Sequence, residues 1–142
     1  ALLETVLNNA NQEFLHLYRN VSSVLSQQGL IGVDLEDFRA VMARGMGLVA
    51  FGHGQGDGLP GANTAFSAAV NHQLLGVERL QNAKGVFVAI HLKSGSQAMN
   101  TIKGVMQSMS AMITDPQALM IYGAVIEPDL PSDISISIMA AL

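Results

Sequence analysis

The chain has 142 residues, of which 49% are hydrophobic and 13% are charged, with a net charge of −4. This composition suits one domain with a buried core, and the low charged fraction indicates that part of its surface is covered by another domain or another copy. It argues against nucleic-acid binding, because no basic stripe can neutralise phosphates. Without cysteine, disulfides and thiolate metal sites are excluded, and no apolar run reaches the roughly 20 residues of a membrane span.

The first 28 residues carry apolar side chains at helical spacing. These are Leu3, Val6, Leu7, Ala10, Phe14, Leu17, Tyr18, Val21, Val24 and Leu25. The pattern predicts one long helix over residues 1–28, which Gly29 ends. Because this helix has no lead-in, we expect the chain to be a piece of something larger.

Residues 29–142 are predicted to alternate between strands and helices after one short helix. The expected elements are a short helix at Asp34–Arg44, a strand at Leu48–Phe51, a glycine-rich loop at Gly52–Gly61, a helix at Ala62–Val70, a strand at Val86–Leu92, a helix at Ser96–Thr114, a strand buried on both faces at Leu119–Ile126, and a half-buried strand at Ile134–Ile138. Strand–helix–strand steps predict parallel neighbours, and the short turn before the last strand predicts a closing hairpin.

The expected fold is therefore α/β (α+β-like). It has a four-stranded mixed β-sheet with two packed helices, preceded by the long N-terminal helix and the short helix.

Two acids, Asp34 and Asp37, stand three residues apart at the start of the short helix. That spacing puts both carboxylates on one face of the first turn, where they could orient a water molecule or take its proton. They could equally be plain caps, since Asp34 is a good N-cap and an acid at Asp37 suits the first turn. From the pattern alone, capping is the favoured interpretation.

Two further patterns suggest sites, and each has a simpler explanation. The segment Gly56–Gly61 matches G-x-G-x-x-G, but Pro60 removes an amide donor and no Lys-Ser/Thr follows, so a surface loop is favoured over a phosphate site. The four histidines show no metal-binding spacing, so no metal site is predicted. They are His16, His53, His72 and His91.

Five short segments stand in a telling order over nearly the whole chain. They are GVDLEDFR at Gly32–Arg39, RAVM at Arg39–Met42, GMG at Gly45–Gly47, KGVFVAI at Lys84–Ile90 and EPDL at Glu127–Leu130. In that order they resemble segments of the FtsZ family, the bacterial tubulin relatives that build the division ring. The family's segments read N-x-D-F-A-D-V-R, R-T-V-M, M-G-x-A, A-R-G-V-L-V-N-I and D-P-D-M.

The resemblance implies that residues 1–28 are the family's central connecting helix and residues 29–142 its C-terminal activation domain. It implies that Asp34 and Asp37 enter the GTP pocket of a neighbouring subunit and polarise the water that attacks the γ-phosphate. Gly32 and Arg39 would support that loop. GTP, with Mg, is expected on the nucleotide-binding domain of the same or a neighbouring subunit, and no cofactor or metal in this chain itself. The implied setting is a cytoplasmic homo-oligomeric division filament.

The chain also departs from the family pattern. Gly32 replaces the loop asparagine, which puts full activity in doubt, and the nucleotide signature G-G-G-T-G and the partner-recruiting tail are missing. We therefore expect an excised domain or a divergent short relative. The alternative function is a non-catalytic module of the same fold that caps or regulates a filament. A third interpretation is a small enzyme with its own pocket at the glycine-rich loop.

Overall fold

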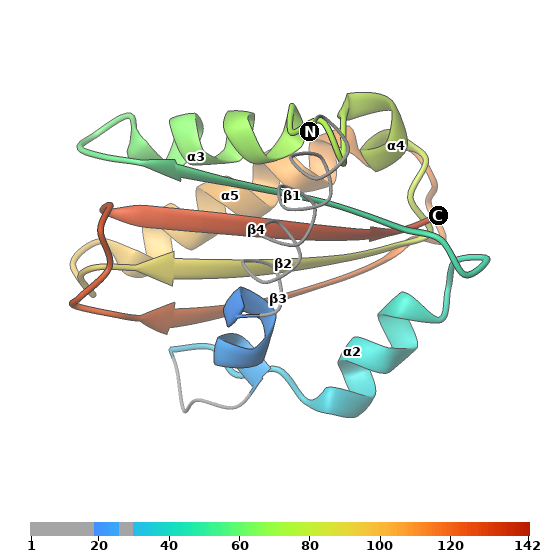
Figure 1. The fold of residues 1–142 in the computed structure, drawn as a ribbon, viewed down its shortest axis with the longest axis horizontal. Coiled ribbons are helices and arrows are strands. Elements are labelled where there is room, and N and C mark those ends of the chain that lie inside the picture. Colours follow the sequence, from blue (N-terminus) through green and yellow to red (C-terminus); the bar gives the residue numbers. More distant parts are fainter. Residues whose placement is uncertain (1–18, 26–29) are drawn as a thin grey trace, which may run out of the picture.

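The structure is a computed structural model that describes residues 19–25 and 30–142. Residues 19–25 are helical, in agreement with the predicted long helix, whose remainder and predicted end at residue 28 lie outside the described residues. The other elements, shown in Figure 1, are α2 (Leu35–Met42), β1 (Val49–Gly56), α3 (Gly61–Val70), α4 (Val77–Gln81), β2 (Gly85–Leu92), α5 (Ala98–Met112), β3 (Leu119–Ile126) and β4 (Ile134–Ala141). The predicted α/β class is confirmed.

The four strands form one mixed sheet in the order β1-β4-β2-β3. Strands β2 and β3 are parallel, as predicted, whereas β4 is antiparallel to both β1 and β2. The predicted hairpin between the last two strands is therefore wrong, and β1 and β2 are separated by β4. The segment 127–133 steps across the end of β2 instead. Glu127 N donates to Leu92 O (2.7 Å) at its start, and Lys93 N donates to Asp133 O (3.0 Å) at its end.

Strand β1 extends through the glycines that composition assigned to a loop. A Cβ at Gly52 would collide with the carbonyl oxygen of Ala69, and one at Gly54 with the carbonyl oxygen of Ala65. Both acceptors belong to α3, so the helix backbone lies directly on the strand. Alternating glycines here permit close helix–strand packing, and the predicted loop is wrong over its first part, residues 52–56, which belong to β1.

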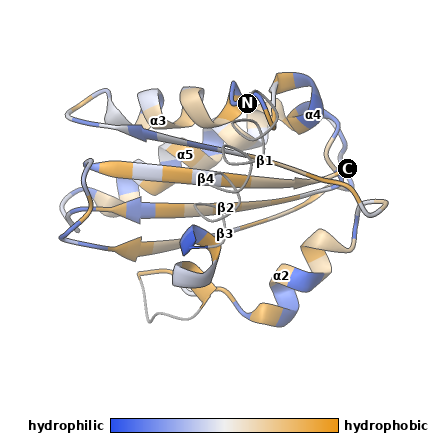
Figure 2. Ribbon diagram, viewed as in Figure 1, coloured by the Kyte–Doolittle hydropathy of each residue, from blue (hydrophilic) through white to orange (hydrophobic). Residues whose placement is uncertain are grey.

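The sheet is covered on both faces. Helices α3 and α5 lie on one face, whereas α2 and residues 19–25 lie on the other (Figure 1). Side chains of β2 alternate between the two cores: Val88 and Ile90 join the larger one, and Phe87 and Ala89 join the smaller one with Val24. Figure 2 shows apolar residues along most of β2 and β4, the two central strands.

Burial of the last two strands differs from the prediction because β4 lies inside the sheet and β3 lies at its edge. Strand β4 is central, so Ser135 and Ser137 are 3% and 1% exposed, and Asn20 Nδ2 donates to Ser137 Oγ (2.7 Å). Strand β3 is an edge strand, and Leu119 and Tyr122 on it are exposed. A half-buried β4 and a β3 buried on both faces are therefore both wrong.

Candidate functional site

The two acids stand at the start of α2, on the exposed outer side of the domain. Asp34 is the N-cap, with extended backbone (φ −75°, ψ 137°), and its Oδ1 accepts from Glu36 N at 3.0 Å. Asp37 follows in the first turn, and both side chains are exposed. Capping by Asp34 is therefore real, but it engages one carboxylate oxygen, and an ionised carboxylate can accept hydrogen bonds on both.

The segment before α2 is tied to the edge of the sheet. Ile31 N donates to Ala124 O at 3.0 Å, and Ala124 N donates to Ile31 O at 2.9 Å, so the two residues form a β-bridge on the free edge of β3. Helix α2 is then fixed from its apolar side, where Phe38 packs edge-on against Phe87 with ring centroids 5.1 Å apart. Two independent anchors therefore set the position of the first turn.

A hollow of about 300 Å³ opens beside these acids. Its lining comes from the loop, the first turn of α2 and the edge strand, and consists of Ile31, Gly32, Val33, Asp37, Met120, Ile121 and Tyr122. The structure thus brings Gly32 and Asp37 to one open concavity, next to Asp34. A water molecule, or an oxygen atom of another molecule, could reach the carboxylates of Asp34 and Asp37 from this side.

The two supporting residues are placed differently. Gly32 is exposed, and a Cβ added there meets no atom within 4 Å among the described residues. Arg39 lies on the exposed surface of α2 in its last turn, where a cation is favourable for the helix dipole. Its carbonyl accepts from Ala43 N at 2.9 Å, which closes the helix.

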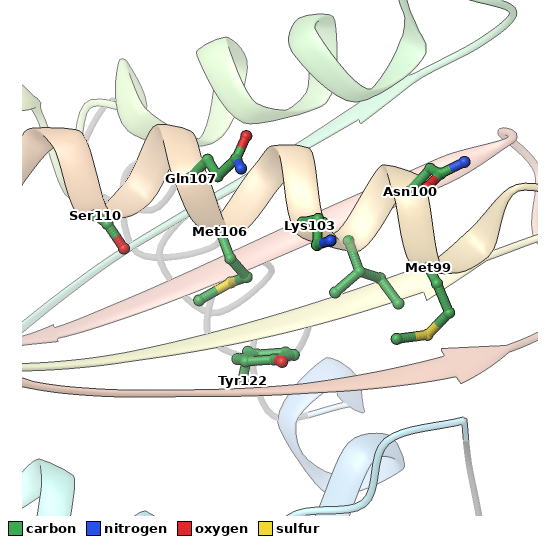
Figure 3. A pocket seen from close by; sticks show the side chains of 8 residues that line it. Met99, Asn100, Lys103, Met106, Gln107, Ser110 and Tyr122 are labelled. Atoms are coloured by element: carbon green, nitrogen blue, oxygen red, sulfur yellow. The ribbon is translucent and has the colours of Figure 1, made fainter.

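A larger groove of about 500 Å³ runs between α5 and β3 (Figure 3). Met99, Met106 and Tyr122 point toward it, and Lys103 and Ser110 lie along its rim. The residues that line it provide no acid–base pair in the described structure.

The glycine-rich loop does not present a phosphate cradle. Gly58 N donates to Asp133 Oδ2 at 2.8 Å, and Asp133 N donates to Asp57 Oδ1 at 2.9 Å. The carboxylate of Asp133 therefore already accepts from the backbone amide of Gly58, which a phosphate at this loop would need as a donor. This finding favours the predicted surface loop over a ligand site.

Two of the described histidines, His53 and His72, lie close together, whereas His91 is buried in β2. His91 is 2% exposed, and neither of its ring nitrogens is hydrogen-bonded within the described part of the chain. Burial lowers the pKa of His91, while Glu127 Oε1, 3.7 Å from Nε2, acts in the opposite direction. The rings of His53 and His72 have centroids 4.9 Å apart and are tilted by 48°. Within residues 19–25 and 30–142, no group of three potential ligands could hold a metal ion, and no helix combines the length and apolarity of a membrane span. His16 lies outside the described residues.

The sequence did not single out the residues of β3 that hold the loop. Ala124 pairs with Ile31, and a Cβ at the neighbouring Gly123 would meet Val33 Cγ2 at 2.6 Å. The available signal was the glycine inside an otherwise apolar strand pattern, which marks a close approach of another part of the chain.

Comparison with known proteins identifies the family of this chain. The family model described as "FtsZ family, C-terminal domain" matches residues 45–141. The chain is 30% identical to the cell division protein FtsZ of Pseudomonas putida over 122 residues, covering 86% of this chain and 30% of the relative. It is 28% identical to FtsZ 1 of Methanocaldococcus jannaschii over 134 residues, covering 94% of this chain and 36% of the relative.

Solved structures of FtsZ share the fold of this chain. An empty FtsZ dimer from M. jannaschii superimposes with a TM-score of 0.83 at 26% identity, covering 99% of this chain and 40% of that one. CetZ from Methanosaeta thermophila shares the fold, with a TM-score of 0.76 at 16% identity. The chain therefore spans well under half the length of the proteins that it matches.

Proposed function

Because this chain belongs to the FtsZ family and corresponds to its C-terminal domain, we propose that it activates GTP hydrolysis by a neighbouring subunit of a division filament. Asp34 and Asp37 are the residues that it supplies. The observation that carries the proposal is their placement, exposed on the first turn of α2 beside an open hollow. Gly32 borders that hollow, and Arg39 completes the short helix that presents the acids.

The chemistry asked of the two acids is modest. Phosphoryl transfer depends mainly on placing the attacking water and on charge near the reacting phosphate. A carboxylate fixed at a helix N-terminus can hold a water molecule by accepting its hydrogen bond. Asp34 can do so while Oδ1 caps α2, so the capping and catalytic interpretations are compatible.

The nucleotide lies on another domain in this proposal. We place GTP, with Mg, on the nucleotide-binding domain of the same or a neighbouring subunit, in a cytoplasmic homo-oligomeric filament. The chain's own part is to present acids to water at that site. The family assignment and the coverage of only 30–40% of the relatives support this division of labour.

A second function is favoured by one observation. Gly32 leaves the loop without a side chain beside Asp37, so the same fold could cap or regulate a filament without chemistry. The two functions differ in what the carboxylates do.

A chimera tests the main proposal. The whole chain replaces the matching segment of P. putida FtsZ, and Asp34→Asn with Asp37→Asn is introduced. We expect GTP binding to persist and GTP turnover to fall by roughly tenfold or more relative to the chimera with both acids. Unchanged turnover would support the capping function.

A further inference from the structure

Gly123 lies in the middle of edge strand β3, where three parts of the chain meet. A Cβ built there would lie 2.6 Å from Val33 Cγ2 and 3.2 Å from Ile31 O, and closer still to Val24 Cγ1. Carbon atoms normally approach to about 3.5–4.0 Å, so a methyl group does not fit. The φ angle of Gly123 is not positive, so the need for glycine is spatial and not conformational.

The three groups around Gly123 belong to different elements. Val24 lies on the helical segment 19–25, and it joins the smaller core with Phe87. Ile31 and Val33 belong to the segment that enters α2. The helical segment, the loop and the sheet edge therefore take their mutual positions at this one residue.

The residues on either side of Gly123 connect this junction to the acids. Ala124 forms the bridge with Ile31, and Tyr122 lines the hollow beside Asp37. Val33 precedes Asp34 by a single peptide bond, so any displacement of Val33 moves the N-cap of α2. A side chain at position 123 would clash with both Val24 and Val33, and the shift that it forces on Val33 would carry Asp34 with it.

We propose that Gly123 is a positioning residue for the reaction: its missing side chain seats Val33 on β3 and so sets how far Asp34 and Asp37 reach from the domain. This inference rests on the proposed function of the two acids. A displacement of about 1 Å can cost roughly a hundredfold in rate even when every reacting group is present. GTP binds on the other domain, so its affinity depends little on this packing.

The test uses the same chimera with P. putida FtsZ, carrying Gly123→Ala. We expect kcat for GTP to fall roughly ten- to a hundredfold, with the KM for GTP within about twofold of the parent. Adding Val33→Ala, which removes the Val33 methyl groups from the contact while Val24 Cγ1 remains, is expected to restore part of the lost kcat. Gly104→Ala is the matched control, because a Cβ there meets no described atom within 4 Å, and its kcat should equal that of the parent.

A second variant covers the case in which Gly123→Ala does not fold. Val33→Leu strains the same contact from the loop side and leaves β3 intact, and we expect the same loss of kcat. The inference is overturned if Gly123→Ala folds and keeps a kcat within about twofold of the parent. If Gly123→Ala does not fold, the same result for a folded Val33→Leu overturns it. The inference is also overturned if the double variant Gly123→Ala with Val33→Ala regains the melting temperature of the parent but not its kcat. Gly123 would then act on stability alone.

The acid variants separate this outcome from failure of the proposed function. If Asp34→Asn with Asp37→Asn leaves turnover unchanged, the catalytic role of the acids is wrong, and the positioning inference falls with it. If that variant loses turnover while Gly123→Ala retains it, only the positioning inference is wrong.

Discussion

Ile31 and Ala124 exchange two backbone hydrogen bonds, of 3.0 and 2.9 Å, across the free edge of β3. This bridge lies three residues before Asp34, so the acids are presented from a segment that is fixed to the sheet. An edge strand normally offers unpaired N–H and C=O groups to other chains. Here part of that edge is used to hold the loop, which ties the geometry of the site to that of the fold.

The first prediction separates capping from chemistry at Asp34. Asparagine caps a helix about as well as aspartate, whereas alanine costs about 1 kcal/mol. We expect Asp34→Asn to leave the chain's free energy of unfolding nearly unchanged in urea and to lower GTP turnover of the chimera severalfold. Asp34→Ala should lower both. If Asp34→Asn retains full turnover, the carboxylate of Asp34 serves only as a cap.

The second prediction concerns Gly32, which departs from the family's asparagine. A side chain there meets no described atom within 4 Å, and its φ is not positive, so substitution should cost less than about 0.5 kcal/mol. We expect Gly32→Asn to raise turnover of the chimera, because an amide beside Asp37 can help to order the loop or contact the nucleotide. Gly32→Ala is the control for backbone rigidity. Equal turnover in both variants would show that the amide has no role.

The third prediction tests the close packing of β1 on α3. A Cβ at Gly54 would strike Ala65 O and would lie 2.6 Å from Ala68 Cβ. Overpacking of this kind costs about 1–3 kcal/mol, so Gly54→Ala should lower the urea midpoint of the chain. Gly104→Ala, in an open helical position of α5, should instead raise the free energy of unfolding by up to about 1 kcal/mol. A Gly54→Ala chain as stable as the parent would contradict the packing.

The fourth prediction is a pH dependence that comes from His91. Burial lowers its pKa in the folded chain below 6.5, while the unfolded chain titrates near that value. Between these two pKa values the unfolded state binds more protons than the folded state. The contribution of the buried neutral His91 to the free energy of unfolding is therefore fully present above pH 6.5 and is lost as the pH falls below 6.5. Urea unfolding at pH 7.5, 6.5 and 5.5 should show a steeper loss for the natural chain than for His91→Leu. Parallel curves would assign the pH dependence to other groups.

Much of the fold could be predicted from the sequence because it follows from local periodicity. The apolar spacing of α5 and the run of β2 gave both elements to within a few residues. The order of strands could not be predicted in this way. The segment 127–133 suits either a hairpin or a step across β2, and only packing of β4 between β1 and β2 decides. Glycines of β1 were misassigned because their partner, the backbone of α3, is a tertiary contact.

The candidate site, like the fold, could be predicted only in its local features. The spacing of Asp34 and Asp37 predicted a shared face on the first turn of a helix, and the structure places both there. What holds that turn, namely the bridge from Ile31 and the space above Gly123, joins residues about 90 apart in the chain. Sequence spacing carries no information about such a contact, apart from the glycine itself.

The most direct measurement is GTP turnover by full-length P. putida FtsZ with this 142-residue chain titrated in. One series uses the natural chain and the other carries Asp34→Asn with Asp37→Asn, which keeps the cap and the fold. We expect the natural chain to raise or sustain turnover, whereas the variant, which still occupies the interface but lacks the carboxylates, should inhibit it. Equal inhibition by both chains would contradict a catalytic role of Asp34 and Asp37 and identify a capping module.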